Sequence, residues 1–289
     1  MRNNTTTNGA LNRFAVGFSF MFLISELYKR YILESINLNQ TILNIISPFV
    51  LWGIGGLAVH FCVKDIPKKS LPKKSLSKST YITAFFLNFT GIAIIIIITG
   101  ILSNIGFIKV DEQINILANK DNMAYMIFSL LIFNPIVEEL FFRIFPGTRL
   151  SNLGEGVFLL AFSYMFALPH ILSLKLGLLS FINTFLCAII WGYVYIKSGN
   201  PLLPILFHSL ANFFGSVFSN MLPADMLSIY VLIMFAFAII GIVLLIINRK
   251  KISVDGSARI FSSQDVSTVF SNTGIILYTF VIIVLFYTK

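Results

Sequence analysis

The stretch at residues 226–248 reads MLSIYVLIMFAFAIIGIVLLIIN and contains no charged side chain. A transmembrane helix needs about 20 mostly apolar residues, because the hydrocarbon core of a bilayer is roughly 30 Å thick. The rest of the 289-residue chain has the same character: 57% of residues are hydrophobic, 11% are charged, and the mean hydropathy is +0.87. Soluble domains carry about 25% charged residues. The sequence therefore predicts a polytopic membrane protein and excludes a disordered chain or an ordinary cytosolic enzyme.

Similar apolar stretches recur along the whole chain. We expect membrane spans at residues 14–33, 41–63, 81–108, 123–146, 156–173, 176–198, 201–222, 226–248 and 273–288. The first of these is interrupted by Glu26, Lys29 and Arg30. No separate soluble domain or internal repeat stands out. The prediction is an all-α bundle of about eight or nine transmembrane helices, forming one membrane domain over residues 1–289.

Two polar segments, residues 64–80 and 249–272, carry the basic clusters. They contain Lys64, Lys68, Lys69, Lys73, Lys74 and Lys78, and then Arg249, Lys250 and Lys251. Lys and Arg beside membrane spans mark the cytoplasmic side. Six expected crossings separate the segments, which places both on one side. We expect both loops and the N-terminus in the cytoplasm, beneath the cell membrane. The net charge of +9 then indicates contact with anionic lipids rather than with nucleic acid.

Ionisable side chains at membrane depth are costly and are candidates for function. Those within the expected spans are Glu26, Glu138, Glu139, His60, His170 and His208. Glu26 lies close to Lys29 and Arg30, which indicates a pair at the membrane interface. His60 has no polar neighbour at helical spacing and is expected to pack. Cys62 and Cys187 lie in apolar stretches without a metal-binding spacing and are also expected to pack.

The segment Asn134-Pro-Ile-Val-Glu-Glu-Leu-Phe-Phe-Arg143 contains adjacent carboxylates. Adjacent residues are about 100° apart around a helix, so the two carboxylates face different surroundings. Glu139 and Arg143 are i,i+4 and share a face, which predicts an ion pair. Glu138 is then the less compensated carboxylate, which suits a general base.

Two further motifs follow, each on its own expected span. His170 ends Phe166-Ala-Leu-Pro-His, where Pro169 weakens the helix. A lone histidine there could act in catalysis or form a hydrogen bond to another helix. His208 and Asn212 are i,i+4 and face one direction. Together they could stabilise an oxyanion, or they could hold two helices together.

The three motifs resemble those of the CPBP intramembrane proteases, which include CAAX type II prenyl proteases and bacteriocin-processing enzymes and are also called the Abi family. The resemblance covers about residues 123–222 and implies a helical bundle whose cavity opens toward the cytoplasm. It implies that Glu138 activates a water and that His170 helps to hold it. It also implies that Glu139 and Arg143 support the site, and that His208 and Asn212 stabilise the tetrahedral intermediate.

The metal requirement stays open in the sequence. The family is commonly catalogued as metalloproteases, and His170, His208 and Glu138 could supply the three protein ligands of a catalytic zinc. No HExxH helix is present. A metal-free water activated by a glutamate accounts for all six motif residues.

The sequence thus predicts an intramembrane endopeptidase that cleaves a peptide or membrane protein near the cytoplasmic face. Two alternatives stay open. One is a non-catalytic immunity or scaffold protein of the kind associated with bacteriocins. The other is a small transporter with a Glu/His proton relay. The sequence does not specify the substrate or the oligomeric state.

Overall fold

The computed structural model describes residues 4–33, 35–36, 40–69, 71–106, 123–150, 152–172, 177–257 and 260–288. In these residues the regular secondary structure is helical, apart from one isolated bridge between Val254 and Ser257. The first half of the chain contains α1 (Asn4–Tyr28), α2 (Gln40–Pro48), α3 (Gly56–Val63), α4 (Lys78–Asn104), α6 (Met123–Phe128), α7 (Asn134–Glu139) and α8 (Phe145–Gly147). The second half contains α9 (Glu155–Ala167), α10 (Gly177–Ser198), α11 (Leu202–Asn212), α12 (Ser219–Met221), α13 (Leu227–Asn248), α14 (Ser263–Phe270) and α15 (Thr273–Tyr287).

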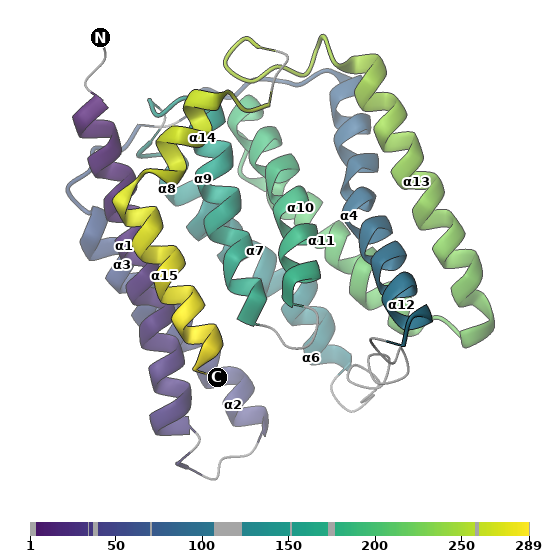
Figure 1. Ribbon diagram of the computed structural model, residues 1–289, viewed down its shortest axis with the longest axis horizontal. Coiled ribbons are helices and arrows are strands. Elements are labelled where there is room, and N and C mark those ends of the chain that lie inside the picture. The colour runs from purple at the N-terminus through teal and green to yellow at the C-terminus, as the bar shows by residue number, and fades with distance from the viewer. Residues whose placement is uncertain are drawn as a thin grey trace.

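Several of these helices are parts of longer runs that pass through π-helical turns. The turns Lys29–Leu33, Phe49–Gly55, Ser129–Phe133, Leu140–Ile144 and Phe213–Phe218 extend or join them. A 3₁₀ turn, Leu168–Leu172, ends α9, and another, Ala224–Met226, precedes α13. Figure 1 shows the resulting bundle of long, roughly side-by-side helices.

The predicted helical membrane fold is confirmed. Among the described residues, seven helices are long and apolar enough to span a membrane, beginning with Asn8–Leu33, which includes the interrupted first stretch. The pair α14 and α15, bent by 63° at its junction, raises the number to eight if it forms one span. The run α6–α8, where we expected a further span, is helical but carries Glu138, Glu139 and Arg143 and is not one of the seven.

The basic loops lie at the same end of the bundle, which we call the lysine end. Lys69 N–H donates to the Thr148 carbonyl at 2.5 Å, and Lys74 N–H donates to the Ser198 carbonyl at 2.8 Å. The Asp255 carboxylate, beyond α13, accepts from the Glu155 N–H at 3.0 Å. The two basic segments therefore lie at the same end of the bundle, as expected from the six crossings between them. The opposite end, which we call the far end, includes the contact between Arg30 and the Thr288 carbonyl at 2.8 Å.

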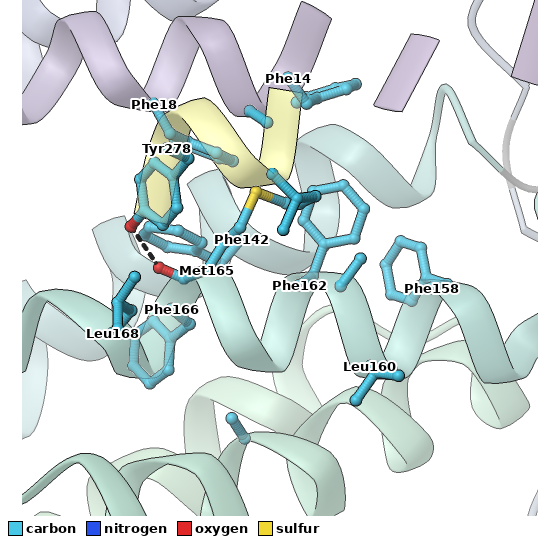
Figure 2. Close-up of a cluster of buried hydrophobic side chains, with 14 of the residues drawn as sticks. Phe14, Phe18, Phe142, Phe158, Leu160, Phe162, Met165, Phe166, Leu168 and Tyr278 are labelled. Atoms are coloured by element: carbon cyan, nitrogen blue, oxygen red, sulfur yellow. Dashed lines mark hydrogen bonds between the residues drawn. The ribbon is translucent and has the colours of Figure 1, made fainter. Parts of the chain in front are cut away.

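An aromatic core lies between α1, α9 and α15 and supports the central helices. Phe14 packs edge-on against Phe162, and Phe18 stacks on Phe142 with ring centroids 4.5 Å apart. Figure 2 shows these rings around Met165, whose carbonyl accepts a hydrogen bond from the Tyr278 hydroxyl. Because Phe142 lies in the same helical run as Glu138 and Glu139, this packing fixes the position of that run.

Helices α4 and α13 form a closely packed pair on the other side of the bundle (Figure 1). A Cβ atom at Gly241 would lie only 2.7 Å from the Phe86 carbonyl carbon, so glycine permits this approach. Helix α4 also packs against α10. Its Asn88 side chain is buried at that contact, close to the candidate site.

Candidate active site

The adjacent carboxylates on α7 lie in different surroundings. The Glu139 side chain is fully buried, whereas 17% of the Glu138 side chain is exposed. This difference follows from their separation of about 100° around the helix. One carboxylate faces the packed interior, and the other faces open space.

Glu139 belongs to a closed polar layer. Its Oε1 atom accepts from Arg143 Nη1 at 3.2 Å and from His208 Nδ1 at 3.0 Å. The Arg143 guanidinium lies over the Phe166 ring at 4.3 Å from the centroid, and its Nη2 atom donates to the Ala188 carbonyl at 3.4 Å. The i,i+4 ion pair expected from the spacing is therefore present, and three helical runs converge on it.

His208 links the two carboxylates. While its Nδ1 atom contacts Glu139, its Nε2 atom lies 3.6 Å from Glu138 Oε2. The two glutamates point in different directions, as expected, but one imidazole reaches both because its nitrogens lie on different edges of the ring. No local pattern along the chain indicates this bridge, because it joins residues 69 positions apart.

Two residues that sequence reasoning missed hold His208 in place. The Trp191 indole stacks on the imidazole with centroids 4.1 Å apart and planes 17° apart. Trp191 Nε1 donates to Asn88 Oδ1 at 2.8 Å, and Asn88 Nδ2 donates to the Phe207 carbonyl at 2.9 Å. Asn88 could have been noticed in the sequence, because it is an amide in the middle of an apolar span. Such residues commonly form hydrogen bonds between membrane helices.

His170 lies in the 3₁₀ turn that follows α9. Its Nδ1 atom is 3.1 Å from the Phe166 carbonyl, and its ring centroid is 5.3 Å from that of Phe166. Phe166 also packs edge-on against His208, with centroids 5.8 Å apart. One aromatic ring from the core thus contacts the guanidinium and both histidines, and it couples the core to the site.

Asn212 ends α11 one helical turn after His208. Its Nδ2 atom donates to the Leu130 carbonyl at 2.8 Å. An amide NH₂ has two donors, so this bond leaves one N–H for another acceptor. The Leu130 contact also joins α11 to the run that carries Glu138.

The candidate residues meet at one cavity of about 860 Å³. Glu138, His170, His208 and Asn212 all line it. His208 and Trp191 line the part of the cavity that adjoins the buried Glu139–Arg143 pair. From there the cavity passes between α4, α10, α11 and α13. Its other lining residues include Asn134, Asn183, Thr184, Ser216, Ser219, Asn220 and Ala224.

A second cavity, of about 540 Å³, reaches Glu138 from the other side. Ser25, Lys29 and Trp52 are among its lining residues. Asn134 and Glu138 line both cavities, so this partly exposed carboxylate lies between two open spaces.

The described residues do not form a metal-binding site. A catalytic zinc takes three protein ligands and leaves one position open. In the part of the chain that the structure describes, no group of three His, Cys, Asp or Glu side chains could hold a metal ion. Both nitrogens of His208 face carboxylates. The set Glu138, His170 and His208 considered from the sequence therefore does not fit zinc in this arrangement.

The segment that carries the candidate site is similar to a known protein family. Residues 120–214 match the family model of type II CAAX prenyl endopeptidase Rce1-like proteins. The predicted resemblance is confirmed. All six motif residues fall inside the matched segment, which supports a CAAX-type intramembrane protease at the level of the family. Searches of curated proteins and of solved structures returned no significant match.

Proposed function

We propose that this protein is an intramembrane endopeptidase in which Glu138 activates a water for direct attack on a peptide bond. The observation that carries the proposal is the contrast on α7. Glu139 is buried and paired with Arg143, while the adjacent Glu138 is exposed to a cavity shared with His170, His208 and Asn212. A stable helix has no need of the second carboxylate, and burying part of it is costly.

The chemistry follows from the positions of the groups. Glu138 takes a proton from the water, and the oxygen adds to the scissile carbonyl carbon. The second N–H of Asn212 donates to the oxygen that becomes negative, a contribution typical of oxyanion holes. Because Nδ1 of His208 already donates to Glu139, the ring adds a second donor through Nε2 only in its doubly protonated form. The C–N bond then breaks, and Glu138 returns its proton to the leaving amine. His170 helps to hold the attacking water.

The Glu139–Arg143 pair has a supporting role in this mechanism. By accepting from Nδ1, Glu139 fixes the orientation of the His208 ring and turns Nε2 toward Glu138. The stacked Trp191 ring restricts rotation of the same imidazole. The protein would act in a cell membrane, with the N-terminus in the cytoplasm and with a peptide or membrane protein as substrate.

Because the substrate is unidentified, the test is a peptidomic comparison. Membranes and culture fluid are collected from cells that carry the wild type, Glu138→Gln or Asp65→Asn at equal protein levels. Asp65 is the matched control, because its carboxylate is 69% exposed and pairs with Arg13 at the surface. We expect peptides that appear with the wild type and with Asp65→Asn but not with Glu138→Gln.

Identical peptidomes from all three strains would contradict the proposal. A host phenotype that persists in Glu138→Gln would then favour an immunity or scaffold protein. Once a processed peptide is known, cleavage by purified protein should continue in the presence of a metal chelator. Loss of cleavage on chelation, restored by added zinc, would contradict the metal-free mechanism.

A further inference from the structure

Arg149 lies at the lysine end, in the turn between α8 and α9, and only 8% of the residue is exposed. Its guanidinium lies over the Phe145 ring, 3.8 Å from the centroid. Nη1 donates to the Phe145 carbonyl at 3.2 Å and contacts the Thr148 hydroxyl at 3.5 Å. Nε is buried and has no hydrogen-bond partner in the part of the chain that the structure describes. A guanidinium has five N–H donors, so these contacts leave donors for a ligand.

The carboxylates at the lysine end do not neutralise this cation. Among the described residues, no ion pair includes Arg149, and an unpaired charge is costly to bury. Arg149 therefore lacks an anionic partner from the described part of the protein, because the carboxylates at this end are bonded to other groups. They are Asp65 with Arg13 at 3.2 Å, Glu155 with Lys197 at 2.6 Å, and Asp255 and Asp265, which accept from the backbone N–H groups of Glu155 and Ser262 at 3.0 and 2.7 Å.

The lysine-rich loop between α3 and α4 crosses the turn that carries Arg149. The Lys69 N–H donates to the Thr148 carbonyl, one residue before Arg149. Lys68, Lys69 and Lys73 are exposed, and none of them forms an ion pair with a described residue. Clusters of Lys and Arg at the ends of membrane helices are typical binding sites for anionic lipid headgroups.

The turn lies at the level where membrane helices begin and end. Helix α9 begins at Glu155 and α10 ends at Ser198, and the Lys197 ammonium donates to the Glu155 carboxylate at this level. The Lys74 N–H donates to the Ser198 carbonyl, so the loop reaches the same level. Because the polar headgroup region borders the hydrocarbon core, a lipid phosphate would lie at this depth.

The outer face of α3 provides an apolar surface beside this turn. The Phe145 ring, which lies under the guanidinium, has its centroid 6.4 Å from that of the His60 ring on α3. Leu57 and Phe61, one turn apart on α3, are 56% and 62% exposed. Lys64 Nζ lies 5.7 Å from the centroid of the Phe61 ring, at the lysine end of the same face. This face is suited to an acyl chain, whereas a soluble anion would leave it uncovered.

We propose that Arg149 and the lysines of the α3–α4 loop bind the phosphate of an anionic phospholipid whose acyl chains lie along α3. Guanidinium groups bind phosphate oxygens through paired hydrogen bonds, which the donors of Arg149 can supply. A zwitterionic headgroup fits less well, because its own amine neutralises the phosphate and is repelled by the lysines. The charge of the sequence indicated contact with anionic lipids in general, and the proposal places one lipid at one turn. Arg149 lines neither cavity at Glu138, so the lipid site does not depend on the proposed reaction.

The test measures lipid binding to the purified full chain in an uncharged detergent. Dioleoylphosphatidylglycerol is titrated, and the half-saturating concentration is taken from the rise in the unfolding temperature. We expect Arg149→Gln to raise that concentration about 10–100-fold, the loss typical of a hydrogen bond to a charged group. Lys250→Gln is the matched control, because it removes one exposed cation from the same end, and it should change the concentration far less. Dioleoylphosphatidylcholine and inorganic phosphate should each stabilise the wild type much less.

Equal losses in Arg149→Gln and Lys250→Gln would overturn the proposal, because the attraction would then be spread over the whole basic end. A wild type that responds equally to phosphatidylcholine, or not at all to phosphatidylglycerol, would also overturn it. An equal response to inorganic phosphate would do the same, since it would indicate a site for a soluble anion. If Arg149→Gln does not fold, Arg149→Lys decides the matter, because it keeps the charge and loses the guanidinium. We expect Arg149→Lys to bind phosphatidylglycerol more weakly than Lys250→Gln does, and equal binding would contradict the proposal.

Discussion

Two regions of this molecule share one helical turn of α7 and differ in almost every physical respect. The layer around Glu139 is closed: a carboxylate, a guanidinium and an imidazole are in direct contact beneath stacked aromatic rings. The wall around Glu138 is open to a cavity, and its polar groups are mostly amides and hydroxyls. The comparison indicates a division between the two regions. The closed layer around Glu139 fixes the positions of the site residues, and the open wall around Glu138 leaves polar groups available to a substrate.

Phe166 belongs to both regions and explains how they are coupled. It lies within the aromatic core of Figure 2, under the Arg143 guanidinium and against both histidines. A change in the closed layer should therefore affect folding first. A change in the open wall should affect turnover first.

Removing the cation of the closed layer should have the largest effect on stability. Arg143→Met leaves Glu139 buried without its main partner, and breaking a buried pair in this way costs about 3–5 kcal/mol. We expect a large fall in the unfolding temperature in detergent. The double variant Arg143→Met/Glu139→Gln should recover part of the loss, because the uncompensated charge is gone. A thermal stability equal to wild type in Arg143→Met would show that the closed layer does not hold the fold.

Removing an amide from the open wall should reduce turnover. Asn212→Ala deletes the proposed oxyanion donor, and such deletions lower kcat about 10²–10³-fold. The measurement is steady-state cleavage of the peptide found by the peptidomic comparison, with kcat separated from KM. Asn220→Ala, in the same cavity but bonded to the Ser216 carbonyl, is the control and should change kcat far less. Equal losses in the two variants would argue against an oxyanion role for Asn212.

The indole beneath His208 should give the smallest of these effects. Trp191→Phe keeps an aromatic ring but removes the donor to Asn88 Oδ1. A buried acceptor left without its partner costs about 1–3 kcal/mol. We expect a modest fall in the unfolding temperature and a smaller loss of kcat than in Asn212→Ala. Trp52→Phe, at the second cavity, serves as the control, and a larger effect there would contradict this account of His208 positioning.

Much of the fold and of the candidate residue set could be predicted from sequence. Apolar stretches of bilayer length predicted the helices, and the i,i+4 spacing of Glu139 and Arg143 predicted the ion pair that the structure contains. Both depend on local periodicity, which one chain displays directly. The roles of the six motif residues remain predictions, although the structure places Glu138, His170, His208 and Asn212 at one cavity.

What the sequence could not give depends on contacts between distant helices. Trp191 and Asn88 are 103 positions apart, and no local pattern indicates their hydrogen bond. The bridge from His208 to both glutamates also requires the packing of α11 against α7.

The most direct test of the division between the two carboxylates compares Glu138→Gln and Glu139→Gln side by side. Each purified variant is measured for its unfolding temperature and for cleavage of the identified peptide. We predict that Glu138→Gln unfolds close to the wild-type temperature and loses cleavage about 10²–10⁴-fold, the range typical of general acid–base groups. Glu139→Gln should unfold at a clearly lower temperature. Cleavage retained by Glu138→Gln, at wild-type stability, would contradict the account.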